Sequence, residues 1–447
     1  MHCSWTCPFG ATAWGRLGLS LLLTLPLAPS VAAMELAPEL RLPPLDLVGP
    51  DIRQRPEEPR NVTPRSRPRP ELAPLGVRVG AFVLAPRVEL RAGYNDNLNA
   101  IEDGRGDAYG VLFPKVDLRS DWSRHALRVG ADALSGRYRD TTSENVDNWT
   151  ATTEGRLDLG RASTLNGNAS VARLHEDRAS PDSIPGAEPT AYRLSEAGAG
   201  WVHPFGRFEA RLQGRLSDYR FEDQAVPAGL APGTVVGDQR DRRTTSTEAR
   251  LRYAVWPGYG AFLRGAFGSQ DYDRRTATGV NRDSRSRELS IGVNLELTDL
   301  IFGDVYVGHR TQVYDEPGVD ANDSFDFGVD LSWNLTRLTT LSVLARRGVE
   351  ESTQPGASGY LSTTWALEVE HELLRNLLLV GGSRQNRRDY DGIERQETVW
   401  QHSFGANYLA NRHLQLRLQF YYRDQDASGG GRRFTQKVVE QGIVIQY

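Results

Sequence analysis

The C-terminal residues 412–447 most constrain what this chain can fold into. Between positions 414 and 422, apolar side chains alternate with polar ones, which is the period-two pattern of a strand with one apolar and one polar face. A loop with glycines at 429–431 follows, and a second strand ends on Tyr447. A final strand in an open sheet exposes an unpaired edge, whereas a closed barrel pairs its last strand with its first. The pattern therefore predicts a transmembrane β-barrel.

Composition agrees with a barrel and excludes other classes. The 447-residue chain has a mean hydropathy of -0.48, and after position 33 no apolar run approaches the roughly 18 residues of a helical membrane span. In a barrel only every second residue faces lipid, so a polar average is compatible with membrane insertion. The formal net charge of -4 argues against a nucleic-acid partner.

The first 76 residues have a different character from the rest. Residues 1–33 place Arg16 before an apolar stretch and end in Val31, Ala32 and Ala33, which predicts a cleavable signal peptide. Residues 34–76 contain ten prolines interspersed with charges, and such a segment is expected to be extended or disordered in the periplasm. It would serve either as a spacer or as a docking arm for a periplasmic partner.

Residues 77–447 repeat the two-sided strand pattern without interruption. Short turns alternate with longer polar loops, which is typical of outer-membrane barrels. We therefore predict an all-β fold, an antiparallel up-and-down barrel of about 18 strands, with both ends on the periplasmic side. The clearest strands cover residues 88–94, 208–216, 289–297 and 325–333.

The polar faces of these strands supply the candidate functional residues. Opposed arginine and acidic side chains could pair across strands and simply solvate a water-filled wall. Alternatively, Arg211 with Arg215 and Arg250 with Arg252 could form a cationic track for acidic solutes or a uronate-bearing polymer. The predicted pore-lining residues are Arg87, Glu89, Arg91, Arg119, Arg211, Arg215, Arg250, Arg252, Glu288, Glu296, Asp326, Asp330 and Arg417.

Catalytic motifs are missing from the sequence. Its eight histidines are scattered, and there is neither an HExxH nor a GxSxG pattern. The glycine run at 429–431 is not followed by a helix with lysine, so it indicates a turn rather than a phosphate site. We expect no enzyme activity, no catalytic residue, no metal and no cofactor.

Residues 88–98 read Val-Glu-Leu-Arg-Ala-Gly-Tyr-Asn-Asp-Asn-Leu. With the barrel layout through Tyr447, this stretch resembles a family of outer-membrane β-barrel porins of proteobacteria, often associated with capsule or exopolysaccharide genes. The resemblance implies passage of polysaccharide with a periplasmic partner. Many such barrels end in Phe; the aromatic Tyr447 implies recognition by the barrel-assembly machinery.

Together these patterns predict a porin-like channel for saccharides or exported polysaccharide in the outer membrane of a Gram-negative cell. Its expected partners are outer-membrane lipid and lipopolysaccharide, the barrel-assembly machinery through the strand ending at Tyr447, and a polysaccharide-export partner through residues 34–76. Two alternatives are a closed structural or adhesive barrel and a barrel enzyme.

Overall fold

The computed structural model describes residues 62–447 except 161, 182, 184–187, 226–233, 236, 277–278, 298–299, 319–320, 351, 353 and 355. The predicted signal peptide and residues 34–61 of the predicted arm lie outside this part. Among the described residues, no helix is both long and apolar enough to cross a membrane.

Strands make up nearly all of the described chain. The first nine are β1 (Val77–Val79), β2 (Phe82–Asn95), β3 (Asp107–Ser120), β4 (Ala126–Tyr138), β5 (Val146–Leu159), β6 (Ser163–His175), β7 (Ala191–Phe205), β8 (Phe208–Phe221) and β9 (Gln224–Ala225). The next six are β10 (Thr234–Val235), β11 (Arg242–Trp256), β12 (Tyr259–Tyr272), β13 (Ser284–Leu297), β14 (Ile301–Tyr314) and β15 (Asn322–Thr336). The last six are β16 (Thr339–Glu350), β17 (Gly359–Leu374), β18 (Leu377–Asp391), β19 (Gln396–Leu409), β20 (Leu414–Ala427) and β21 (Phe434–Gln446). Two short 3₁₀ helices are η1 (Thr142–Glu144) and η2 (Gly237–Arg240).

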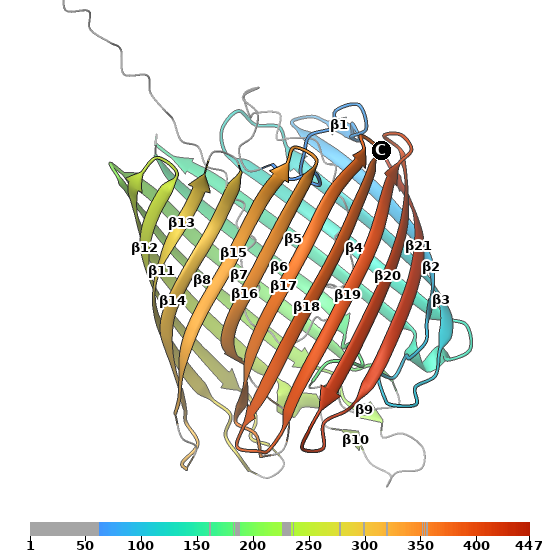
Figure 1. Cartoon of the computed structure of the whole chain (residues 1–447), viewed down its shortest axis with the longest axis vertical. Helices are drawn as coiled ribbons and strands as arrows, with labels where there is room; N and C mark the ends of the chain where they lie inside the picture. The colour runs from blue at the N-terminus through green and yellow to red at the C-terminus, as the bar shows by residue number, and fades with distance from the viewer. Residues whose placement is uncertain are drawn as a thin grey trace, which may run out of the picture. The chain divides into compact units, whose positions relative to one another are not determined.

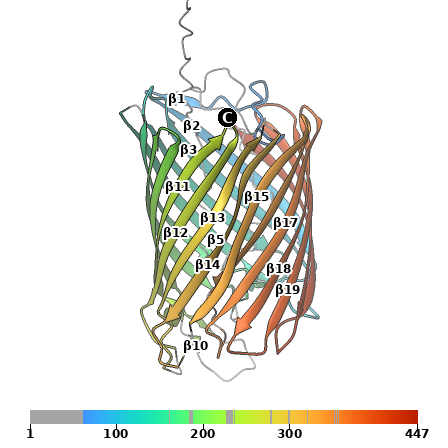
Figure 2. The same ribbon diagram turned by 60° about the vertical axis from the view of Figure 1, so that its left-hand side comes forward.

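The strands close into a barrel. Each wall strand is antiparallel to its neighbours in the chain, and β2 pairs with β21 to seal the cylinder (Figure 1; Figure 2). Of the 19 described strands in this sheet, β1 pairs with β2 alone, which leaves 18 in the wall. The predicted closed 18-stranded barrel is confirmed.

The first wall strand begins at Phe82 rather than near Val77. Residues 77–79 instead form β1, a three-residue strand that folds back on β2. The hairpin turns at Gly80, whose φ of 60° is a backbone conformation that glycine adopts without strain.

The two faces of the wall differ as the alternation requires. One face carries the exposed large apolar side chains, such as Leu212, Leu289 and Ile443. On the other face, Arg250 of β11 contacts Asp304 of β14 at 2.7 Å although β12 and β13 lie between these strands. Only the concave side of a closed wall brings such strands within reach, so the polar face is the inner one.

The ends of the barrel also differ. Tight turns join β7 to β8, β11 to β12, β15 to β16 and β17 to β18 at one end, which also holds β1 and the C-terminus. Longer connections, including β9, β10 and both 3₁₀ helices, lie at the other end (Figure 1). We call these the short-turn end and the long-loop end.

Candidate functional site

The inner face of the barrel is the candidate functional site, and register places every predicted residue on it. The strand positions are β2 (Arg87, Glu89, Arg91), β3 (Arg119), β8 (Arg211, Arg215), β11 (Arg250, Arg252), β13 (Glu288, Glu296), β15 (Asp326, Asp330) and β20 (Arg417). Eight of the thirteen belong to the contacts described below, four of them beside the β2–β21 seam and four on β8, β11, β13 and β15. Their role in permeation stays a prediction.

One group lies beside the seam between β2 and β21. Glu89 accepts hydrogen bonds from Arg417 at 2.9 and 3.1 Å and from Arg87 at 3.2 Å. Arg91 joins Glu89 to Glu440, the latter at 3.2 Å. All five side chains are less than a tenth exposed, so these buried charges are compensated by ion pairs with one another.

A second group includes cations that the sequence pattern did not reveal. Glu288 pairs with Arg264 and, at 2.7 Å, with Arg310, while Asp326 lies 3.8 Å from Arg264. Arg264 escaped prediction because the neighbouring residues 260–268 are mostly small or apolar on both faces, which hides the period of two. Cross-strand register is the information that identifies these arginines.

A row of three arginines runs across neighbouring strands of the wall. Arg211, Arg250 and Arg264 are register partners on β8, β11 and β12; we call them the arginine row. The guanidinium carbon of Arg250 lies 3.7 Å from the ring centre of Phe262, and that of Arg264 lies 4.0 Å from the ring centre of Tyr306. Stacking on aromatic faces holds a guanidinium plane in a fixed orientation.

The long-loop end is crossed by residues 176–181 from the β6–β7 connection, which we call the inward loop. Arg178 pairs with Glu144 at 2.7 Å, and Glu176 pairs with Arg240 of η2 at 2.5 Å. Arg432, between β20 and β21, donates to the carbonyl oxygens of Arg178 and Ser180 at 2.8 and 2.7 Å. The inward loop is therefore fastened to several other loops.

The inward loop reaches nearly across the barrel. Gln354, between β16 and β17, donates to the carbonyl oxygen of Pro181 at 3.0 Å. Eight wall strands separate these two connections in one direction and ten in the other. Ala179 also packs with Ala100 and Phe434 in a small apolar cluster. This loop narrows the long-loop end of the lumen.

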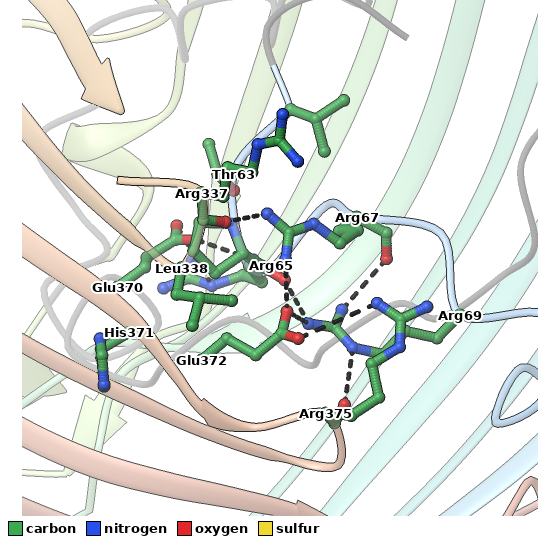
Figure 3. Close-up of polar contacts among 12 residues, drawn as sticks. Thr63, Arg65, Arg67, Arg69, Arg337, Leu338, Glu370, His371, Glu372 and Arg375 are labelled. Atoms are coloured by element: carbon green, nitrogen blue, oxygen red, sulfur yellow. Dashed lines mark hydrogen bonds and ion pairs between the residues drawn. The ribbon is translucent and has the colours of Figure 1, made fainter. Parts of the chain in front are cut away.

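The short-turn end is lined by residues 62–76, which we call the docked segment. Its alternate arginines face the alternate inner-face glutamates of β17: Arg65 pairs with Glu368 and Glu370. Arg67 and Arg69 pair with Glu372 (Figure 3). These residues are the last part of the arm that the sequence predicts, over residues 34–76, to be extended or disordered. Its last 15 positions are held by the barrel wall, because two period-two rows of opposite charge face each other.

Glu372 is the centre of this contact. It accepts a hydrogen bond from Arg67 Nη1 at 2.9 Å and from Arg69 Nη2 at 2.6 Å. Arg69 also donates to the carbonyl oxygens of Pro64 at 2.7 Å and Arg375 at 3.1 Å, as Figure 3 shows for the β17–β18 turn. Burial lowers the pKa of Arg69 and the carboxylate of Glu372 opposes that shift, so the guanidinium stays charged.

The remaining contacts fix both ends of the docked segment. The carbonyl oxygen of Val62 accepts from Asn334 at 3.3 Å, and Glu71 accepts from Arg375 at 2.8 Å. Leu72 packs on the buried pair Leu378 and Leu409. The matching spacing of Arg65, Arg67 and Arg69 with the three glutamates is the sequence signal that could have predicted this contact.

Comparison with solved structures finds similar barrels at low identity. A mutant ferric enterobactin receptor of Pseudomonas aeruginosa, in complex with enterobactin, has 10% identity and a TM-score of 0.46, covering 81% of this chain and 81% of that chain. OccK3 (OpdO) of P. aeruginosa has 14% identity and a TM-score of 0.42, covering 81% and 95%. OpdK of P. aeruginosa with vanillate has 10% identity and a TM-score of 0.45, covering 81% and 99%.

Comparison with curated proteins gives no match. Comparison with family models gives a match over residues 69–447, which includes the whole barrel and the end of the docked segment. The barrel is a porin-like outer-membrane protein, and the chain belongs to the family described as "Putative beta-barrel porin 2".

Proposed function

We propose that this barrel is a passive channel for saccharides, with acidic polysaccharide as the solute that its wall suits best. The observation that carries the proposal is the arginine row, Arg211, Arg250 and Arg264, on the inner face of an 18-stranded barrel. Barrels of 16 to 18 strands leave room for an aqueous channel. Charged and polar side chains on the inner face favour water and hydrated solutes over lipid.

The chemistry of the row favours carboxylate-bearing sugars. A guanidinium fork binds a carboxylate with two parallel hydrogen bonds. Arg211 is held by Glu209 at 2.6 Å and Arg250 by Asp304 at 2.7 Å, so each fork is oriented before a solute arrives. Partial neutralisation by these acids weakens each interaction with a uronate, which allows the solute to leave as well as enter.

The proposal also assigns the two ends and the partners. Short turns lie on the periplasmic side of outer-membrane barrels and long loops outside, so we place the docked segment at the periplasmic mouth of a Gram-negative outer membrane. The apolar outer face would contact lipid and lipopolysaccharide, and the barrel-assembly machinery would recognise the strand that ends at Tyr447. Because residues 62–76 contact the wall, a polysaccharide-export partner would bind within residues 34–61.

Planar-bilayer recording of the full processed chain tests this function. We expect stable channels whose current is blocked by uronate oligomers at concentrations where neutral oligomers of equal length have little effect. A folded, heat-modifiable protein without conductance would exclude the channel. Equal block by charged and neutral oligomers would exclude the preference for acidic saccharides but not the channel.

The inward loop favours a second candidate, a structural or adhesive barrel that does not conduct. Residues 176–181 are fastened to connections around the rim, including Gln354 on nearly the opposite side. The same recording separates the two functions. Conductance that arises solely after removal of the inward loop would favour the closed barrel.

A further inference from the structure

The periplasmic mouth contains three carboxylates in one line. Glu368, Glu370 and Glu372 occupy alternate inner-face positions of β17, so successive carboxylates lie on the same side of one strand. Three like charges so close together repel one another and attract cations. In this structure Arg65, Arg67 and Arg69 of the docked segment meet them.

The charges balance when the segment is docked. Four cations, Arg65, Arg67, Arg69 and Arg375, face four acids, Glu71 and the three glutamates of β17, which gives 4 - 4 = 0. Without residues 62–76, Arg375, which lies 3.9 Å from Glu372, is the cation that remains in this group of described ion pairs, which gives 1 - 3 = -2. The docked segment thus neutralises the local negative charge rather than merely filling space.

The balanced charges also remain within reach of a passing solute. The side chains of Arg65, Arg67 and Glu368 are 20%, 24% and 38% exposed, whereas Arg69 and Glu372 are 0% and 6% exposed. One end of the contact is therefore a buried anchor and the other faces water. Partly exposed charges at the mouth act on ions over about 8 Å at physiological ionic strength.

We infer that residues 62–76 are a selectivity element of the channel: by neutralising Glu368, Glu370 and Glu372, they let anionic solutes pass a mouth that would otherwise select cations. This inference rests on the proposed channel function. The residues that determine selectivity are Arg65 and Arg67, which stand at the water-facing end, while Arg69 holds them in place through Glu372.

Three variants in planar bilayers under a salt gradient test the inference. R65Q/R67Q/R69Q removes three of the four cations that face these carboxylates, so the ratio of cation to anion permeability is expected to rise severalfold. E368Q/E370Q/E372Q frees the arginines, so the ratio is expected to fall below that of the unmodified chain. The sixfold variant removes both sets of charges, and its ratio is expected to return toward the unmodified value.

The two sets of substitutions act as a cycle that separates charge from folding. Heat-modifiability of each variant shows that the barrel itself is closed, because residues 62–76 are not part of the wall. A conducting R65Q/R67Q/R69Q variant with unchanged permeability ratio would overturn the inference and leave the channel function intact. A sixfold variant that shifts as far as R65Q/R67Q/R69Q would also overturn it, since loss of the segment's bulk would then explain the shift. Absence of conductance in every form would remove both the channel and the inference.

Discussion

Arg69 and Glu372 lie 303 positions apart in the chain, yet a hydrogen bond of 2.6 Å joins Nη2 of the arginine to Oε2 of the glutamate. The two side chains are 0% and 6% exposed. The net contribution of a buried ion pair to stability is smaller than the cost of removing one partner. Removal of one partner leaves the other charge buried without compensation.

Substitution R69A should release residues 62–76 from the wall. The loss of the charge partner of Glu372 is expected to weaken docking by about 3 kcal/mol. Limited proteolysis of folded barrels would then cut residues 62–76 much faster than in the unmodified chain. R78A is the matched control, since Arg78 pairs with Asp121 at 64% exposure and outside this contact; equal protection of both variants would contradict the prediction.

Substitution E89A should destabilise the barrel at its seam. Glu89 faces Arg87, Arg91 and Arg417, which would be left as buried cations with one fewer carboxylate. We expect a loss of about 3–5 kcal/mol in the free energy of unfolding, read as a lower midpoint in urea-gradient heat-modifiability. E154A, at a site 59% exposed, should change the midpoint little.

A single arginine on the lipid face should be far more harmful than one on the adjacent inner position. Leu212 is 48% exposed on the outer side of β8, so L212R would place a charge in hydrocarbon and cost about 2–4 kcal/mol near the bilayer midplane. Gln213 points inward, and Q213R is expected to be tolerated. Comparable folding yields in lipid vesicles for both variants would contradict the assigned faces.

Charge reversal in the arginine row should change ion selectivity. Because Arg211 and Arg250 are register partners on the inner wall, R211E/R250E would replace two cations by two anions and shift the reversal potential toward cation preference. The control is R243E, which changes the outer face of β11 at a side chain 58% exposed. Reversal potentials unaltered by R211E/R250E would remove the row from the permeation route.

Loosening the inward loop should enlarge the channel. R432A would remove the two hydrogen bonds to the carbonyl oxygens of Arg178 and Ser180, each contributing about 1 kcal/mol. Single-channel currents should then be larger and noisier. R433A is the natural control, because the neighbouring Arg433 is 63% exposed and pairs with Asp426; the same increase in both variants would rule out a specific role for the loop.

Much of the fold was predictable from the sequence, because the alternation of side chains along a single strand depends on neighbouring residues alone. Alternation in strands such as β20, where Leu416 and Leu418 face outward and Arg417 inward, reports the environment of each face directly. The ion pairs on the inner wall could not be predicted from this alternation. Arg264 sits among small residues that mask the period, and pairing of Arg250 with Asp304 depends on barrel curvature.

The docked segment's contact with the wall could not be predicted from composition, because composition indicates whether a segment can form an apolar core and not where the segment lies. Its prolines and arginines are unsuited to an apolar core. Inside a polar barrel the same residues find carboxylates, and the lumen supplies the hydrogen bonds that water would supply elsewhere. Sequence spacing can suggest such a match, but the facing partner, Glu372, belongs to a strand distant in the chain.

The seam between β2 and β21 has a consequence for how the molecule assembles. Every other wall strand bonds to neighbours from the same region of the chain, so hairpins can form while the polypeptide is still incomplete. The nine residue pairs of the seam join the first wall strand to the last. The chain entropy lost on closing this long loop is therefore paid in a single late step. Until that event the growing sheet retains two edges of unpaired backbone N–H and C=O groups, at which strands of another chain can pair.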